Sequence, residues 1–305
     1  MKKSTWNISK APSQKGKIAI VTGANAGLGF ETALGLAQKG AKVIMACRNI
    51  VKAEKAKAAI LKKVPDGDVV VMEIDLSKLK SVSNFAKAFL KNYDALHLLI
   101  NNAGVMIPPY EKTEDGFELQ MGANYFGHFL LTGLLLETIM QTPESRVVSL
   151  SSLAHKAGDI HFDNLHWETG YVKMKAYRQS KLACLIFAFE LQRRLDKAGS
   201  YTLSVAAHPG ISDTELGKHI PKLMYLLFRP LASFYIQKPE HGALPTLMAA
   251  LGTEVKGGEY YGPTGNSQET KGPPGLARSK SKARSEELGK RLWSVSEELT
   301  GVKIL

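Results

Sequence analysis

Two residues with the spacing needed for proton transfer lie in the segment Tyr177-Arg178-Gln179-Ser180-Lys181. The apolar run at residues 182–191 indicates that this segment is helical and largely buried. In a helix, side chains four residues apart lie on the same face, so Lys181 would hold a cation beneath the phenol of Tyr177. A free phenol ionises only near pH ~10, and a fixed cation beside it favours the phenolate. The pair could therefore act as general acid and base, while the Ser152 hydroxyl steadies a substrate oxygen.

A glycine-rich turn stands between a predicted strand at residues 17–22 and a predicted helix at residues 28–39. Its glycines follow the spacing Gly-x-x-x-Gly-x-Gly, not the more familiar Gly-x-Gly-x-x-Gly. They permit a tight turn and let the backbone approach a pyrophosphate at the positive end of the helix. A turn needed only for packing is the alternative. The cofactor-binding residues expected here are Gly23, Asn25, Ala26, Gly27, Leu28 and Gly29.

The end of the second predicted strand bears on the choice of dinucleotide. Sites that prefer NAD usually carry an acid at this position, where it holds the ribose 2′-hydroxyl. This strand instead ends in Cys47-Arg48-Asn49. A guanidinium suits a 2′-phosphate through charge-assisted bonds. Arg48 and Asn49 therefore predict NADP(H), against the alternative of a plain surface arginine.

Further polar residues follow the third and fourth predicted strands. Asp75 and Leu76 close the third strand, and Asn102-Ala103-Gly104 closes the fourth. Ligands of open α/β sheets bind at the carboxyl ends of strands, so all five residues are candidates for cofactor binding. Asp75 could accept a bond from an adenine amine, or it could cap the helix that begins near Ser77.

The elements that must position these residues alternate between strand and helix through the first 210 residues. This alternation predicts a parallel sheet covered by helices on both faces, and right-handed crossovers make the fold doubly wound. No internal repeat and no linker between two cores is found, so we expect one domain. Strands are expected at residues 17–22, 41–46, 69–74, 96–100, 146–150 and 201–207.

Composition excludes several classes of protein. The 305 residues carry 40 basic and 28 acidic side chains, a net charge of +12, yet no nucleic-acid motif appears and no nucleic-acid partner is expected. The basic residues are scattered, with one group near the start and another in the C-terminal tail, and we expect both ends to be solvated and partly mobile. Two cysteines give no disulfide framework, and no signal peptide or 18-residue apolar run is present. We expect a soluble cytoplasmic protein without a transmembrane segment.

Together these motifs resemble the short-chain dehydrogenase/reductase family over about residues 16–262. The order and spacing match in Thr22–Gly29, Asn102-Ala103-Gly104, Asn124, Ser152, Tyr177 with Lys181, and Pro209-Gly210. The resemblance implies a Rossmann-type sheet, and hydride transfer between a nicotinamide and a carbonyl or alcohol carbon. The family uses no metal, and the irregular spacing of His155, His161 and His166 gives no reason to expect one.

The same resemblance assigns roles to individual residues. It implies that Tyr177 is the acid and base, that Lys181 binds the nicotinamide ribose, and that Ser152 rather than Ser151 orients the substrate oxygen. Asn124 would complete the catalytic set by kinking its helix and holding a water, although a satisfied buried amide is the alternative. Asn102 and Ala103 would flank the adenosine ribose. The nicotinamide would be lined by Pro209, Gly210, Ile211 and Thr214.

One departure points to a branch of the family. Ser152 and Tyr177 stand 25 positions apart, which is longer than in typical small members. The insertion at residues 159–165 resembles that of the retinol-dehydrogenase-like branch. The same branch is indicated by Ala46-Cys47-Arg48-Asn49, Ser151-Ser152-Leu153-Ala154-His155 and Trp293-Ser294-Val295-Ser296-Glu297. This branch is NADP(H)-leaning and acts on apolar alcohols and aldehydes.

Residues 220–236 are rich in Leu, Met, Tyr and Phe and fall where the family places its substrate lid. A lid over about residues 212–236 would expel water and implies an apolar alcohol or carbonyl substrate. An ordinary core-packing helix pair is the alternative, and a peripheral membrane contact is a third possibility because Lys222 and Arg229 flank the apolar face.

The expected organisation is a basic extension at residues 1–15, a catalytic domain at 16–262, and a basic C-terminal extension with a short helix at 263–305. By analogy with relatives, the apolar helices near residues 127–140 and 182–191 would pair in a homodimer or homotetramer. The expected function is an NADP(H)-dependent oxidoreductase. Its rivals are a non-catalytic NADP-binding sensor or scaffold on the same fold, and an epimerase or dehydratase that recycles the hydride.

Overall fold

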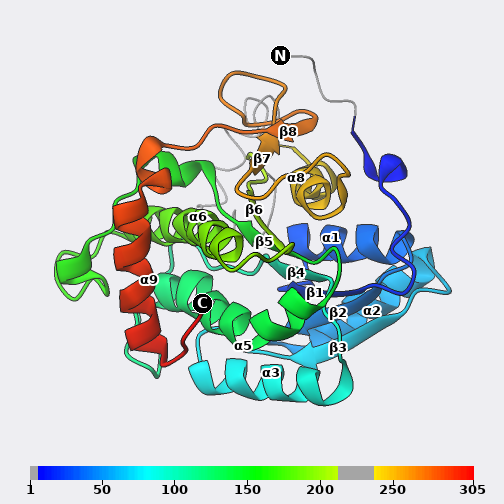
Figure 1. Cartoon of the computed structure of the whole chain (residues 1–305), viewed down its shortest axis with the longest axis horizontal. Helices are drawn as coiled ribbons and strands as arrows, with labels where there is room; N and C mark the ends of the chain where they lie inside the picture. Colours follow the sequence, from blue (N-terminus) through cyan, green and yellow to red (C-terminus); the bar gives the residue numbers. More distant parts are fainter. Residues whose placement is uncertain (1–5, 212–236) are drawn as a thin grey trace, which may run out of the picture.

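A computed structural model of the chain describes residues 6–211 and 237–305. The described residues form one eight-stranded sheet in the order β3-β2-β1-β4-β5-β6-β7-β8 (Figure 1). Neighbouring strands are parallel from β3 through β7, and only β8 runs antiparallel, against β7. The predicted single-domain, doubly wound Rossmann-type fold is confirmed.

The six strands expected from the sequence lie within two residues of their predicted bounds. The strands are β1 (Ile18–Thr22), β2 (Lys42–Cys47), β3 (Val69–Glu73), β4 (Leu98–Asn101), β5 (Arg146–Leu150), β6 (Leu203–Ala207), β7 (Tyr260–Pro263) and β8 (Pro274–Leu276). The α-helices are α1 (Gly27–Gln38), α2 (Ile50–Lys63), α3 (Leu79–Asn92), α4 (Leu119–Met121), α5 (Gly127–Gln141), α6 (Lys173–Lys197), α8 (Pro239–Leu251) and α9 (Glu286–Thr300). Short helical turns are η1 (Ile8–Lys10), η2 (Gly122–Phe126), η3 (Leu153–Ala157), η4 (Phe162–Asn164) and η6 (Ser281–Arg284).

The sheet separates two apolar layers. Helices α1, α2 and α8 cover one face, and α3, α5 and α6 cover the other (Figure 1). Because successive side chains of a strand point to opposite faces, Ile20 of β1 enters one layer while Ala19 and Val21 enter the other. Both faces are buried, which explains why the strands read as nearly continuous apolar runs.

The C-terminal helix α9 lies on the outer side of α5 and α6 (Figure 1). Its Trp293 is 1% exposed, with ring centroids 5.2 Å from Phe129 and 5.7 Å from Phe187. The chain then turns at Gly301, and Ile304 packs against Gly133 of α5. The expectation of a solvated end is therefore wrong for this part of the chain, because successive turns of α9 carry apolar side chains that pack against α5 and α6.

Helix α9 also bears on the expected association of copies. Helices α5 and α6, which were expected to pair with a second copy, pack in part against α9 of the same chain. The oligomeric state itself stays a prediction. Within the described ranges, no helix is both long and apolar enough to cross a bilayer.

Candidate active site

Helix α6 carries both residues of the proposed acid–base pair. Tyr177 and Lys181 are 7% and 6% exposed, four residues apart on this buried helix. The Lys181 ammonium donates to the carbonyl of Leu150, the last residue of β5, at 3.1 Å. A Cβ added to Gly104 would lie 3.3 Å from that ammonium, so the glycine leaves it room. The structure thus brings Lys181 to the carboxyl ends of β4 and β5.

Two adjacent serines follow β5, and their hydroxyls have different partners. Ser151 is 3% exposed and donates to the carbonyl of Lys181 at 2.8 Å. The Ser152 oxygen caps η3 by accepting from the backbone N–H of Ala154 at 3.2 Å. The Ser151 hydroxyl therefore holds the strand to α6. Ser152 lies at the partly exposed edge, and its choice over Ser151 stays a prediction that this geometry favours.

Asn124 lies in η2, a π-helical turn between α4 and α5. Its side chain accepts from the N–H of Val105 at 2.7 Å and donates to the Val105 carbonyl and the Ser180 hydroxyl. This is the satisfied buried amide considered as the alternative, and it occurs together with the expected break in the helix. A Cβ on Gly104 would lie 3.2 Å from the Asn124 Oδ1 atom, so Asn124 and Lys181 flank the same glycine. Its role in a water relay stays a prediction.

The glycine-rich turn has the geometry of a dinucleotide cradle. Gly23 has a φ of +67°, a backbone conformation that residues other than glycine rarely adopt. A Cβ on Gly29 would lie 2.3 Å from the Gly23 carbonyl oxygen, so only glycine fits there. The residue before α1 is Ala26, whose side chain cannot accept a hydrogen bond. The first N–H groups of the helix are therefore not capped by this side chain. A pyrophosphate suits such a set of donors, so the residues present fit a nicotinamide dinucleotide.

Thr22 connects this turn to the segment after β4. Its hydroxyl accepts from the N–H groups of Asn102 and Ala103, both at 2.9 Å, while the Asn102 amide donates to the Thr22 carbonyl at 2.7 Å. His128 lies 2.9 Å from the same hydroxyl through Nε2 and donates from Nδ1 to the Asn124 carbonyl. Burial lowers the pKa of His128 to about 4, so the ring is neutral. Sequence reasoning missed His128, whose only signal was its place four residues after Asn124 in an apolar helix.

The segment after β2 places Arg48 at the exposed rim. Asn49 accepts from the Lys52 N–H at 2.9 Å and so caps α2. Cys47, just before them, is fully buried, and burial raises the pKa of its thiol to about 11 although the N–H groups of Ala24 and Asn25 point to it. Arg48 is thus an exposed residue that directly follows β2, next to the buried Cys47 that lies against the glycine-rich turn.

Asp75 does not cap α3, the helix role that was considered beside adenine binding. The N-cap residue of α3 is Lys78, which makes no side-chain cap, and Asp75 instead forms a turn with Ser77 before the helix. One carboxylate oxygen accepts from the N–H and the hydroxyl of Ser77, at 3.0 and 2.6 Å. Leu76 is buried, and its carbonyl lies against Gly127 at the start of α5. A bond from Asp75 to adenine would have to use the other oxygen, and it stays a prediction.

The segment expected to line the nicotinamide follows β6. Gly210 has a φ of +70°, and a Cβ there would lie 2.2 Å from the carbonyl oxygen of Thr270. The N–H of Ile211 donates to that same carbonyl at 2.8 Å. Gln237 donates to the Pro209 carbonyl at 2.6 Å. Thr214 and the expected lid at residues 212–236 lie outside the described residues.

Sequence reasoning missed the loop that holds this segment. Residues 264–273 connect β7 to β8 and contact both the segment at 208–211 and η3. Their Gly, Pro and polar composition reads as a solvated tail, and no periodic pattern marks them as part of a site. Among residues 6–211 and 237–305, no group of three or more His, Cys, Asp or Glu is arranged to hold a metal ion.

Comparison with known proteins agrees with this geometry. The family model of short chain dehydrogenases matches residues 17–223. Human retinol dehydrogenase 11 is 44% identical over 291 residues, which make up 95% of this chain and 87% of that protein. A crystal structure of an uncharacterised protein from Mycobacterium paratuberculosis has a TM-score of 0.83 at 38% identity, covering 99% of this chain and 100% of that one. An Escherichia coli short-chain dehydrogenase complexed with NADPH has a TM-score of 0.62 at 22% identity, over 81% and 95% of the two chains, which supports the fold alone.

Proposed function

The chain belongs to the retinol-dehydrogenase-like branch of the short-chain dehydrogenase/reductase family, and from this premise we propose that it is an NADP(H)-dependent oxidoreductase acting on apolar substrates. The reaction would interconvert an alcohol and its aldehyde or ketone. The observation that carries the proposal is the burial of Tyr177 and Lys181 on α6, with Lys181 beside Gly104 and Asn124 at the carboxyl edge of the sheet.

A dinucleotide bound at this edge would supply or accept a hydride at its nicotinamide ring. The glycine-rich turn and the first N–H groups of α1 would bind its pyrophosphate. Arg48, at the exposed rim after β2, would bind the 2′-phosphate and so give the preference for NADP(H). Lys181 would bind the nicotinamide ribose, while Pro209, Gly210 and Ile211 would line the ring.

The chain's own residues would control the proton. The Ser152 hydroxyl would donate a hydrogen bond to the substrate oxygen and so fix it toward Tyr177. The phenol of Tyr177 would then give its proton to an alkoxide as it forms, or take one from an alcohol. The ammonium of Lys181, held in the same buried site, would favour the phenolate between these steps.

The apolar substrate class is supported by two observations. Human retinol dehydrogenase 11, 44% identical to this chain, carries the name of an apolar alcohol. Residues 220–236 are rich in Leu, Met, Tyr and Phe and follow the segment that would line the nicotinamide. An apolar cover would expel water before hydride transfer.

The test is turnover of NADPH with aldehydes and ketones of graded chain length, run in parallel on the wild type and on Tyr177→Phe. We expect Tyr177→Phe to lose about 10²–10⁴ in kcat, the usual scale of general acid–base catalysis, and to keep its NADPH affinity. Tyr201→Phe, at a tyrosine that is 94% exposed, is the matched control and should turn over normally. Near-normal turnover by Tyr177→Phe would refute the assignment. NADPH binding without turnover of any carbonyl would favour a non-catalytic sensor.

A further inference from the structure

A buried carboxylate lies beside the candidate active site without a role in the proposed chemistry. Glu269 belongs to the loop between β7 and β8 and is 6% exposed. Its φ of +59° puts it in the left-handed region, which residues other than glycine seldom adopt. Such a conformation persists only where the surroundings hold it, and these positions concentrate at functional sites.

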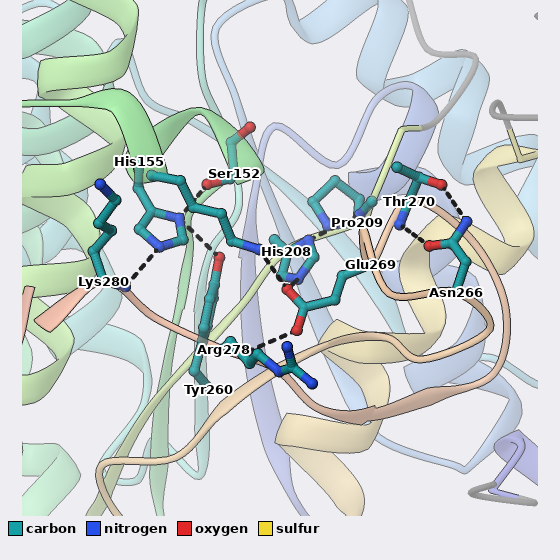
Figure 2. Close-up of polar contacts among 12 residues, drawn as sticks. Ser152, His155, His208, Pro209, Tyr260, Asn266, Glu269, Thr270, Arg278 and Lys280 are labelled. Atoms are coloured by element: carbon teal, nitrogen blue, oxygen red, sulfur yellow. Dashed lines mark hydrogen bonds and ion pairs between the residues drawn. The ribbon is translucent and has the colours of Figure 1, made fainter.

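Three segments converge on Glu269 (Figure 2). One of its carboxylate oxygens lies 2.8 Å from the ammonium of Lys156, and the other accepts from the N–H of Arg278 at 2.9 Å. His208 brings its Nε2 atom to 3.9 Å from the same carboxylate. The side chain therefore joins η3, the start of the segment after β6, and the chain after β8.

The tautomer of His208 places the ring proton on the nitrogen that lies nearest to the carboxylate. Its Nδ1 atom accepts from the N–H of Gly210 at 3.2 Å, so the ring proton must sit on Nε2. That nitrogen is fully buried, has no hydrogen-bond partner among the described residues, and faces Glu269. Burial lowers the pKa of His208 to about 3, which keeps the ring neutral and preserves the arrangement. The Nε2–H group of His208, the residue that begins the Pro209-Gly210-Ile211 segment, thus lies 3.9 Å from the carboxylate.

Lys156 lies in the turn that Ser152 caps. Within this turn, His155 donates from Nδ1 to the Ser152 carbonyl at 2.6 Å, while its Nε2 atom accepts from the N–H of Lys280 at 3.4 Å (Figure 2). The Tyr260 hydroxyl lies 3.5 Å from the same ring. The carbonyl of Ser152 is thus bonded to the ring of His155. The residue after His155, Lys156, forms an ion pair with Glu269.

We propose that Glu269 is a positioning residue whose carboxylate fixes the Ser152 turn relative to the segment at residues 208–211. Through these contacts it sets the distance between the group that orients the substrate oxygen and the residues that line the nicotinamide. The inference rests on the proposed function for the role of Ser152. Its effect on the segment at 208–211 follows from the contacts of His208 and Thr270 alone.

A second glutamate provides a matched control. Glu144 also has a left-handed φ, +55°, and its carboxylate lies 2.6 Å from the ammonium of Lys17. Its side chain is 77% exposed and precedes β5, at the edge of the sheet away from the site. Glu144→Gln and Glu269→Gln therefore make the same chemical change at the same backbone conformation, and only the second touches the site.

We expect Glu269→Gln to lower kcat by about tenfold or more and to weaken NADPH binding by about three- to tenfold, because small displacements of reacting groups are costly. Glu144→Gln should leave both within about twofold. NADPH affinity is measured by fluorescence titration, which needs no turnover. If the wild type fails to turn over any carbonyl, the proposed function fails, and the NADPH titration still decides the inference for residues 208–211.

Lys156 is half-buried and gives a variant that tests the same contact from the other partner, in case Glu269→Gln does not fold. Lys156→Met should lower kcat in the same direction, Lys156→Arg should restore it, and the double variant Lys156→Met/Glu269→Gln should fall no further than Glu269→Gln alone. The inference is overturned if Glu269→Gln or Lys156→Met lowers the melting temperature but leaves kcat and NADPH affinity within about twofold. It is also overturned if their effects simply add.

Discussion

The two sides of the candidate site are held together in different ways. On the side of β1 and β4, the glycine-rich turn is fixed by Thr22 and Asn102, which belong to the motifs themselves. On the side of β5 and β6, Glu269 binds the Ser152 turn and its neighbour Thr270 binds the segment at 208–211; both lie more than fifty residues further along the chain. The cofactor side is thus self-contained, whereas the catalytic side depends on the C-terminal segment.

The contrast between the two sides requires that the C-terminal segment contribute strongly to the stability of the fold. Trp293 of α9 is 1% exposed, stacks on Phe187 and lies under the guanidinium of Arg194. We expect Trp293→Ala to lower the free energy of unfolding by about 3–5 kcal/mol, because it leaves a cavity between α9 and α6. Urea denaturation followed by circular dichroism measures this change. Trp293→Phe, which keeps an aromatic ring, should lose much less; equal losses would assign the effect to the indole N–H, which donates to the Ile304 carbonyl at 3.2 Å, and not to the packing of the ring.

Because the cofactor side is self-contained, we expect a substitution there to weaken binding of only one part of the dinucleotide. Arg48→Ala should lower kcat/KM with NADPH by about 10- to 100-fold, the value of about 1.5–3 kcal/mol for a hydrogen bond to a charged group, and leave kcat/KM with NADH nearly unchanged. Steady-state kinetics with both dinucleotides measures the ratio. Lys52→Ala removes an exposed positive charge from the nearby first turn of α2 and serves as the control. Equal losses with NADPH and NADH would assign Arg48 to the fold.

A third expected effect concerns the pH dependence of stability on the catalytic side. Burial, with Lys156 and His155 nearby, lowers the folded-state pKa of His208 to about 3, while an unfolded histidine titrates near pH ~6.5. Between these values the unfolded state binds the extra proton, so stability falls as the pH falls below about 6.5. The slope from this residue approaches about 1.4 kcal/mol per pH unit.

His208→Asn keeps an acceptor for the N–H of Gly210 but cannot take up a proton. Its free energy of unfolding should therefore change less steeply with pH than that of the wild type between pH 6 and pH 4. The difference in slope corresponds to the uptake of up to about one proton on unfolding. Denaturant titrations at several pH values compare the two slopes. Parallel slopes would show that His208 does not contribute to the acid sensitivity of the catalytic side.

The same difference explains what could be read from the sequence. The six parallel strands and the glycine-rich turn were predictable because their signals are local: apolar runs, glycines at fixed spacing and polar residues at strand ends. Asp75 shows the limit of such signals, because a carboxylate after a strand suits a helix cap as well as a ligand. The pattern allowed both roles, and the structure places Asp75 in a turn with Ser77 instead of at the N-cap of α3.

The rest depended on contacts between distant residues. Strand β7 has only four residues and includes a glycine and a proline, so it lacks the length and composition that mark a strand. Helix α8 contains Pro245, which argues against a helix in any local reading. Glu269 lies in a segment that resembles a solvated tail, and its partner Lys156 stands 113 positions earlier. Such pairings leave no trace in spacing or periodicity.

Both cysteines of the chain are free and buried, one on each side of the site. Cys47 lies under the glycine-rich turn, and Cys184 of α6 donates to the carbonyl of Asn124. Burial raises the pKa of both thiols, so neither is a ready nucleophile in the folded protein. Alkylating reagents would reach them only as the surrounding structure opens. The chain therefore carries two native reporters of local opening, and their separate labelling rates record the order in which the two sides of the site come apart.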